Sequence, residues 1–398
     1  MVGMKLIKSC ISCLLFITLF TLISTSADAA INRYWIAIDD GATKYWSDNA
    51  NWSNAQGGSG GYSAPLSNNY KVFFNDAGAD VTVDKSIIRL NKLTIKHDYD
   101  GTIDLNGNEL NPQQGYAQYS GTLLVSENSY FKVQGKAAYM YGGTIEAQGN
   151  NSKINIDHNF IFYTGSTVIA PGPGTNRFIV RGGFRNQGGT FTHSSGTVTM
   201  STKNGWGEAM VKVTGTGAFY NIDFRGNVHK KLHTDIEVEN NLEIRGNGDL
   251  RGNGKNITVK GYWWQQNNKN NFSHGNSTVI FSGSSAQTIK SENNFSNITI
   301  SNSAGVSLIN EPTTVLTTLT INSGSTLDIN GENLTVGTLV NNGNLQLQGS
   351  ETVNITTMDT DSGTVTYDGS GATGLVAGDT YHNLTFNQSG TSTLDANL

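Results

Sequence analysis

Short runs in which apolar and polar side chains alternate recur along most of the chain. In GTVTY, residues 363–367, Val365 and Tyr367 fall on one side and Thr364 and Thr366 on the other. A period of two is typical of a strand with one buried face. Asn-Gly pairs, which tolerate the positive φ of tight turns, separate many runs, as at 106–107, 253–254, 330–331 and 342–343. No helical period follows residue 29, so the pattern predicts an all-β protein.

One phrase occurs three times, as FYNIDF (219–224), FSNITI (295–300) and YHNLTF (381–386). An alternating run precedes each copy: GTVTM, STVIF and GTVTY. The order is the same each time, with a period of about eighty residues, and such a period indicates stacked repeats. We place the repeat units at 196–276, 277–362 and 363–398, the last one incomplete.

The repeats favour a right-handed parallel β-helix, because stacked coils build one core from strands this short. Each unit is expected to hold three to four coils of roughly twenty residues. Tandem β-sandwich repeats are the alternative, since Asn-Gly turns also suit hairpins. In the β-helix the shared Asn of the phrase lies at a corner. The side chains predicted to point inward are Ile222 and Phe224, Ile298 and Ile300, and Leu384 and Phe386.

Composition supports an ordered chain with an acidic surface. Only 14% of the 398 residues are charged, and 47 glycines against 5 prolines suit a turn-rich β protein. The formal net charge is −5. This balance gives no reason to expect nucleic acid or anionic lipid as a partner.

Residues 1–29 have the features of a signal peptide. Lys5 and Lys8 precede an apolar stretch at 11–23 that is too short to cross a bilayer as a helix, and Ala27-Asp28-Ala29 supplies the small residues before a cleavage site. Cleavage before Ala30 would remove the only cysteines, Cys10 and Cys13, and bring the net charge to −6. The mature chain is therefore expected to be exported, free of disulfides and without a membrane span.

The start of the mature chain, residues 33–84, combines an early Trp, a WSDxxNWS phrase, a Gly-rich loop, VFF and an Asp-rich turn. It resembles the opening module of large bacterial surface proteins, including autotransporter passengers, and the repeats are similar to their β-helical stalks. The resemblance implies a capping module at 30–110, which shields the open strand edge, and β-helical repeats at 111–398. The membrane barrel of an autotransporter is not found, so we expect either a fragment or a short secreted relative.

Two acidic groups were considered as sites. Asp76, Asp80 and Asp84 have a spacing that distributes them around turns rather than focusing them on one point, so solvated loop charges are favoured. The second group is Asp39, Asp40 and Asp48, which lie near Trp46 and Trp52 in the sequence. These tryptophans suggest a carbohydrate-contacting patch, with buried core or cap residues as the alternative.

Basic and aromatic candidates are few. Arg177, Arg181 and Arg185 suit an acidic sugar, although a solvent-facing set is favoured. Of the pair Trp263-Trp264, one ring is expected inside and the other on the surface. His229 and His233 have near-ligand spacing, but no third ligand is close in the sequence, which disfavours zinc.

From these observations we assign no catalytic, cofactor-binding or metal-binding residue. The sequence favours a non-enzymatic, adhesin-like structural protein, secreted or on the cell surface, that contacts cell-surface or matrix glycans or proteins through loops along a rod. The alternatives are an extracellular polysaccharide lyase or glycosidase, or a carbohydrate-binding protein, on the same scaffold.

Overall fold

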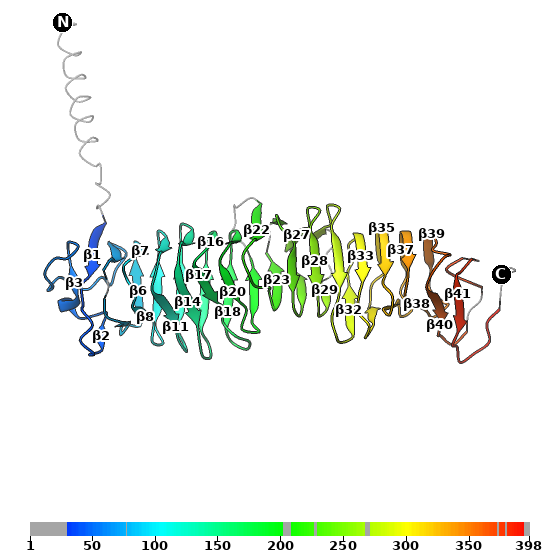
Figure 1. Ribbon diagram of the computed structural model, residues 1–398, viewed down its shortest axis with the longest axis horizontal. Coiled ribbons are helices and arrows are strands. Elements are labelled where there is room, and N and C mark those ends of the chain that lie inside the picture. Colours follow the sequence, from blue (N-terminus) through cyan, green and yellow to red (C-terminus); the bar gives the residue numbers. More distant parts are fainter. Residues whose placement is uncertain are drawn as a thin grey trace, which may run out of the picture.

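The chain forms an elongated rod built almost entirely of short strands (Figure 1). The computed structural model describes residues 30–76, 78–201, 208–226, 229–266, 271–371, 374–378 and 380–393. Strands account for 48% of the structure and helix for 1%. Within these residues the helix is a single 3-10 turn, η1 (Asn49–Asn51). The predicted signal peptide, 1–29, lies outside the described residues.

Two of the four sheets begin at the N-terminal end of the rod. Sheet A contains, in spatial order, β3 (Trp52–Ser53), β1 (Ile31–Trp35), β4 (Tyr70–Phe74), β7 (Lys92–Ile95), β10 (Tyr116–Gln118), β13 (Ala138–Met140), β16 (Phe160–Tyr163), β19 (Phe184–Gln187), β22 (Ala209–Val213), β24 (His229–Leu232), β27 (Asp249–Arg251) and β30 (Phe272–Ser273). Sheet B contains β2 (Lys44–Tyr45), β5 (Val81–Thr82), β8 (Thr102–Asp104), β11 (Thr122–Val125), β14 (Gly143–Ala147), β17 (Ser166–Ile169) and β20 (Thr190–Thr192).

The other two sheets reach the C-terminal end. Sheet C contains β6 (Ile87–Leu90), β9 (Glu109–Pro112), β12 (Tyr130–Val133), β15 (Lys153–Ile156), β18 (Arg177–Val180), β21 (Thr197–Met200), β23 (Asn221–Arg225), β26 (Leu242–Arg245), β29 (Trp263–Gln265), β32 (Gln287–Lys290), β34 (Val306–Leu308), β36 (Thr326–Asp328), β38 (Asn344–Leu347), β40 (Thr364–Tyr367) and β41 (Asn383–Phe386). Sheet D contains β25 (Ile236–Val238), β28 (Asn256–Val259), β31 (Thr278–Phe281), β33 (Phe295–Ile300), β35 (Thr313–Ile321), β37 (Leu334–Asn341) and β39 (Val353–Thr357).

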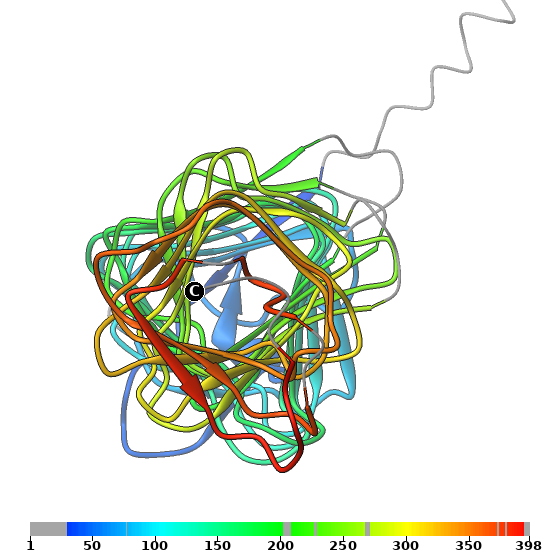
Figure 2. The same cartoon turned by 90° about the vertical axis from the view of Figure 1, so that its right-hand side faces the viewer.

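The predicted parallel β-helix is confirmed. The chain winds around one axis (Figure 2). It passes in turn through sheets A, B and C, then through A, D and C, and beyond β30 through D and C alone, so each strand pairs with the strand one coil away. Among the named strands of the described residues, only β1 and β3 pair antiparallel. Tandem sandwiches joined by hairpins would require antiparallel pairs throughout. The sandwich alternative is therefore wrong.

Coils of about twenty residues are also confirmed, and about 14 of them stack along the rod. Trp263 pairs with Ile289 at the longest step in sheet C and Leu327 with Leu345 at the shortest, so coil length varies from 26 to 18 residues. With about 4.8 Å between neighbouring strands, 14 coils rise by about 65 Å.

Sheets B and D form successive parts of one face. The isolated bridges Thr190–Thr216 and Phe219–Val238 connect the last strand of sheet B to the first strand of sheet D through the segment 216–219. Beyond β30, the long strands β35 and β37 bend with a register shift and pair over both their halves. The coil thus continues beyond β30, although its strands now belong to two sheets, C and D.

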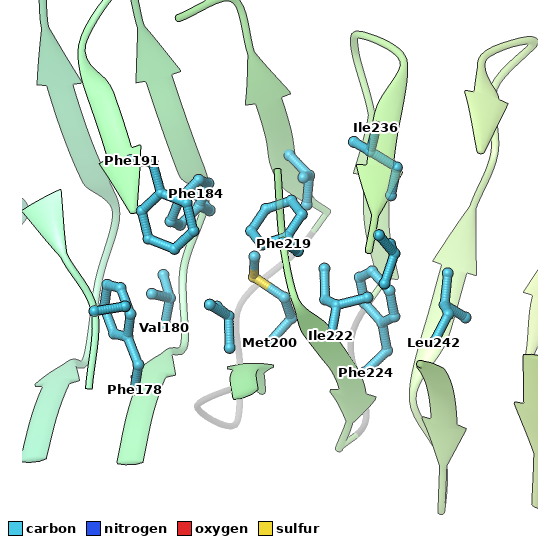
Figure 3. Packing of buried hydrophobic residues seen from close by; sticks show 14 of the residues in the cluster. Phe178, Val180, Phe184, Phe191, Met200, Phe219, Ile222, Phe224, Ile236 and Leu242 are labelled. Carbon is cyan, nitrogen blue, oxygen red and sulfur yellow. The ribbon is translucent and has the colours of Figure 1, made fainter. Parts of the chain in front are cut away.

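One hydrophobic cluster extends from Trp35 to Ala377, as expected for coils that share a core. Side chains from successive strands point into the same interior (Figure 3). In sheet C the pairing places one buried residue above the next: Leu110, Phe131, Ile154, Phe178, Val198, Ile222, Leu242 and Trp263. Because the whole cluster is continuous, none of the repeats has a separate core in the residues that the structure describes.

In two copies of the repeated phrase the predicted side chains point inward. Ile222, Phe224, Ile298 and Ile300 are all buried. The third copy departs from the prediction, since Phe386 is 43% exposed and Leu384 only half-buried. Their strand, β41, is the last in sheet C, so no further named strand stacks beyond it in the described residues.

The copies of the phrase do not occupy equivalent places. Asn221 and Asn383 begin strands of sheet C, next to a corner, whereas Asn297 lies inside β33 of sheet D beside a register shift. The eighty-residue sequence period therefore does not return the chain to the same face. Strands with the same alternation of apolar and polar residues can lie in sheet C or in sheet D, because both sheets cover the same core.

The N-terminal end is closed by a reversed strand and a tryptophan cluster. β3 runs antiparallel to β1 and occupies the outer edge of sheet A. A reversed strand of two residues offers little edge for pairing with another chain. No break follows this cap at residue 110, because β9 pairs with both β6 and β12.

Candidate functional site

The first predicted acidic group does not converge. Asp84 accepts hydrogen bonds from the backbone N–H and the hydroxyl of Ser47. Asp80 accepts from the backbone N–H of Thr102 at 2.6 Å, and Asp76 accepts from the Gln56 amide at 3.2 Å. Each carboxylate joins a different pair of segments, so the three stabilise turns of the cap.

The second acidic group also forms local turn contacts. Asp39 accepts from the N–H of Gly41 at 3.0 Å, and Asp48 caps the short helix by accepting from the N–H of Ala50 at 2.9 Å. Asp40 lies 2.7 Å from the Lys44 ammonium, and this hydrogen bond is the main cause that lowers the pKa of Asp40.

An open cavity of about 500 Å³ lies beside these residues. Asp39, Asp80, Asp100 and Lys44 are among its lining residues. In the part of the chain that the structure describes, no three His, Cys, Asp or Glu side chains are grouped as a metal site would require. Of the six predicted acidic residues, only Asp39 and Asp80 line this cavity.

Trp46 and Trp52 are buried, which contradicts the carbohydrate-contacting patch suggested for them. Both are 0% exposed, and their ring centroids lie 5.0 Å apart. The Trp46 indole N–H donates to the carbonyl of Pro65, and that of Trp52 donates to the carbonyl of Trp46. Trp35 and Phe74 complete the cluster. The tryptophans are cap residues because each indole N–H finds a backbone acceptor inside the core.

The pair Trp263-Trp264 is arranged as predicted. Trp263 is fully buried against Phe272 and Phe295. Trp264 is half-buried on the outside, with the Lys290 ammonium 5.9 Å from its ring centroid. Alternation along β29 explains this division.

The three arginines lie on different parts of the rod. Arg177 is exposed on sheet C. Arg181 donates to the side chains of Asn155 and Asp157 at the following corner. Arg185 is half-buried on the solvent side of sheet A. They do not form one anion site.

The two histidines are separated in the same way. His229 contacts the carboxylate of Asp249, one coil away. His233 lies after the same strand, and its pKa is lowered by burial and by the nearby charge of Lys231. The pair thus has different partners.

The sequence interpretation missed a row of stacked rings on the outside of sheet A. We define the tyrosine row as His97, Tyr119, Tyr141 and Tyr163. Successive centroids are 4.6, 4.7 and 5.2 Å apart, and the two tyrosine pairs are nearly parallel, at 16° and 4°. These residues recur every 22 positions, which is one coil. That spacing is the signal that could have revealed the row.

The tyrosine row is accessible. Tyr141 is 41% exposed, and the ring of Tyr139 lies parallel beside it at 6.0 Å. Partial burial, with the neighbouring phenols, raises the pKa of Tyr141, so its hydroxyl stays protonated at neutral pH. The Lys96 ammonium lies 5.8 Å from the ring centroid of Tyr119. Because the rings stack on each other, their edges and hydroxyls face the solvent.

No family model matches this chain, and neither a curated protein nor a solved structure is found to match it. Within the described ranges, none of the helices has the length and apolar character needed to cross a bilayer. The tyrosine row is therefore identified as a candidate site from its geometry alone.

Proposed function

We propose that the protein is an exported, adhesin-like β-helical rod that binds its partner through the outside of sheet A and does not catalyse a reaction. The tyrosine row carries this proposal. Tyrosine suits binding surfaces because it combines an apolar ring with a hydroxyl that both donates and accepts. Surface aromatic residues gathered in one place are typical of interaction sites.

The scaffold supports this role. A row built on paired strands of a solenoid is held in place by the ladder and by the shared core, so binding needs little further ordering. The predicted acidic residues, by contrast, are occupied in turns of the cap. Export rests on the signal-like residues 1–29 and on the absence of cysteine from residues 30–398.

Two measurements test the proposal. The full chain, expressed in a Gram-negative host, should lose residues 1–29 and begin at Ala30 outside the cytoplasm; an uncleaved cytoplasmic product would contradict export. The purified mature chain should bind glycans on an array and release no new reducing ends from them. Rapid depolymerisation would contradict the non-catalytic role.

A triple variant locates the contact. Tyr119→Ser, Tyr141→Ser and Tyr163→Ser together should abolish binding while the far-ultraviolet CD spectrum stays unchanged. The matched control changes three half-buried tyrosines elsewhere on the rod, Tyr130, Tyr220 and Tyr262, to Ser. Equal losses in both variants would refute the assignment of the tyrosine row.

A further inference from the structure

The outside of sheet A is rich in cations although the protein as a whole is acidic. We call its solvent-side positions from β4 to β22 the outer face. Lys71, Lys92, Arg185 and Lys212 lie on this face, and Lys96 follows β7 directly. Along the strands β4 to β22 the solvent-side positions include no Asp or Glu. Since the formal net charge of the chain is −5, this distribution is a local concentration of positive charge.

The cations are placed in like-charged pairs. Lys71 pairs in register with Lys92 on the next coil, and Arg185 pairs with Lys212. Neighbouring strands are about 4.8 Å apart, and like charges directly opposite one another destabilise a sheet. Among the described residues none of these four side chains forms an ion pair. An anionic ligand would compensate a charge that the protein leaves uncompensated.

A second observation points the same way at Arg185. Its buried Nε atom has no hydrogen-bond partner within the described part of the chain. The pKa of His233 is lowered by burial and by Lys231, is raised by Glu208, and is lowered further by Arg185 and Lys212, so both cations of this pair lie close to its imidazole. Arg185 as a whole is half-buried, so a ligand on the outer face would contact the exposed part of its guanidinium, which suits a carboxylate or sulfate oxygen.

Along the rod the tyrosine row spans the coils of β7 to β16, at the C-terminal ends of these strands, whereas Lys71 and Lys92 lie near the starts of theirs. In sheet A the order is β4, β7, β10, β13, β16, β19 and β22, so Lys92 and Arg185 are four coil steps, or about 19 Å, apart (Figure 1). A ligand that reaches both pairs must be an extended chain of several units that lies along the rod. Between its ends it would contact phenol rings whose centroids are 4.7 and 5.2 Å apart.

The stacking of the row disfavours nucleic acid. Proteins bind single strands by stacking bases on free aromatic faces. Here both faces of Tyr141 are covered by Tyr119 and Tyr163, and Tyr119 has His97 on its other side, so the middle of the row offers edges and hydroxyls rather than free faces. Hydroxyl donors and acceptors match the hydroxyl groups of sugars. We infer that the outer face binds an acidic polysaccharide, with Lys71, Lys92, Arg185 and Lys212 contacting its anionic groups and the tyrosine row contacting its sugar hydroxyls.

This inference rests on the proposed function, because it names the ligand class of the same surface. The test compares polygalacturonate with its fully methyl-esterified form, which has the same backbone without the charge. The mature chain should bind polygalacturonate, and binding should weaken as NaCl is raised from 50 to 500 mM. The ester should bind at least about tenfold more weakly.

Two quadruple variants with equal changes in net charge locate the site. K71Q/K92Q/R185Q/K212Q should weaken binding of polygalacturonate by at least about tenfold. K85Q/R89Q/K132Q/K153Q, on the solvent side of sheet C and in the turn that leads into it, should leave it within about twofold. Both variants should keep the CD spectrum and melting temperature of the parent, because these side chains are exposed or half-buried.

Three results would overturn the inference. They are equal binding of polygalacturonate and its ester, equal loss in the two quadruple variants, and equal or tighter binding of a single-stranded oligonucleotide. Binding of neutral glycans alone through the tyrosine row would refute the acidic ligand and leave the proposed function intact. If the parent protein binds no glycan at all, both the acidic ligand and the proposed function are refuted.

Discussion

Lys230 provides a quantitative test of the interior. It lies in β24 on the inner side of sheet A, is 1% exposed, and pairs in register with Ala209 and Leu250. Its ammonium donates to the carbonyls of Arg181 and Gly182 at 3.0 and 2.6 Å. Burial lowers the pKa of Lys230 from 10.5 to about 7.

The sign of the pH effect follows from this shift. Between pH 7 and 10.5 the unfolded chain holds the proton on this lysine and the folded chain does not, so folding becomes more favourable as the pH rises. Each pKa unit corresponds to about 1.4 kcal/mol. A shift from 10.5 to about 7 therefore corresponds to on the order of 5 kcal/mol, which is gained progressively between about pH 7 and pH 10.5 and is absent below pH 7.

The variant Lys230→Met isolates the effect. Met fills a similar volume without a titrating group, although the two carbonyls lose their donor, which gives a constant penalty. Urea unfolding followed by tryptophan fluorescence should give a free-energy difference, parent minus variant, that is flat below pH 7 and rises by about 3–4 kcal/mol up to pH 10. Lys136→Met, at an exposed turn, should give a flat difference throughout. A flat line for Lys230→Met as well would refute the depressed pKa.

Three further changes test the packing and the turns. Phe184→Ala, at the centre of rings that include Phe162 and Phe219, should lower the free energy of unfolding in urea by about 3–5 kcal/mol, and a loss below 1 kcal/mol would contradict the packed core. Gly143→Ala should lower the free energy of unfolding by at least about 1–2 kcal/mol in the same assay. The φ of Gly143 is +76°, and a Cβ there would lie 2.5 Å from the carbonyl oxygen of Ser120. An unchanged urea midpoint would refute this close approach of neighbouring coils. Asp84→Ala should cost about 1–3 kcal/mol and speed amide exchange at Ser47, whereas unchanged exchange would show that this bond does not hold the cap.

The sequence predicts the β-helix because strand alternation and coil length are both local properties. Val365 and Tyr367 are buried as their period of two requires. The sequence does not predict which sheet a strand joins. The same alternation of apolar and polar residues occurs around Val198, which lies in sheet C, and around Val279, which lies in sheet D. That assignment depends on how many residues each corner takes, and corner length varies from coil to coil.

The candidate site was less accessible to sequence reasoning. The polar neighbours of Trp46 and Trp52 in the sequence suggest a surface patch, whereas the burial of both rings depends on Phe74, which comes from another strand. The 22-residue spacing of Tyr119, Tyr141 and Tyr163 becomes meaningful only once one coil is known to take 22 residues there. Long-range register therefore decides the site, while local pattern decides the fold class.

Engineered disulfides test most directly whether successive coils pair in register, since residues 30–398 contain no cysteine of their own. Thr144 pairs with Thr122 on one neighbouring coil and with Thr167 on the other. Neighbouring strands lie within the Cα separation that a disulfide accepts, whereas Thr122 and Thr167, two coils apart, are separated by about 9.6 Å, which is too far. Oxidation should therefore close T122C/T144C and T144C/T167C, as seen by gel mobility, and leave T122C/T167C as free thiols. Efficient closure of T122C/T167C, with failure of the other two pairs, would contradict the stacked parallel coil.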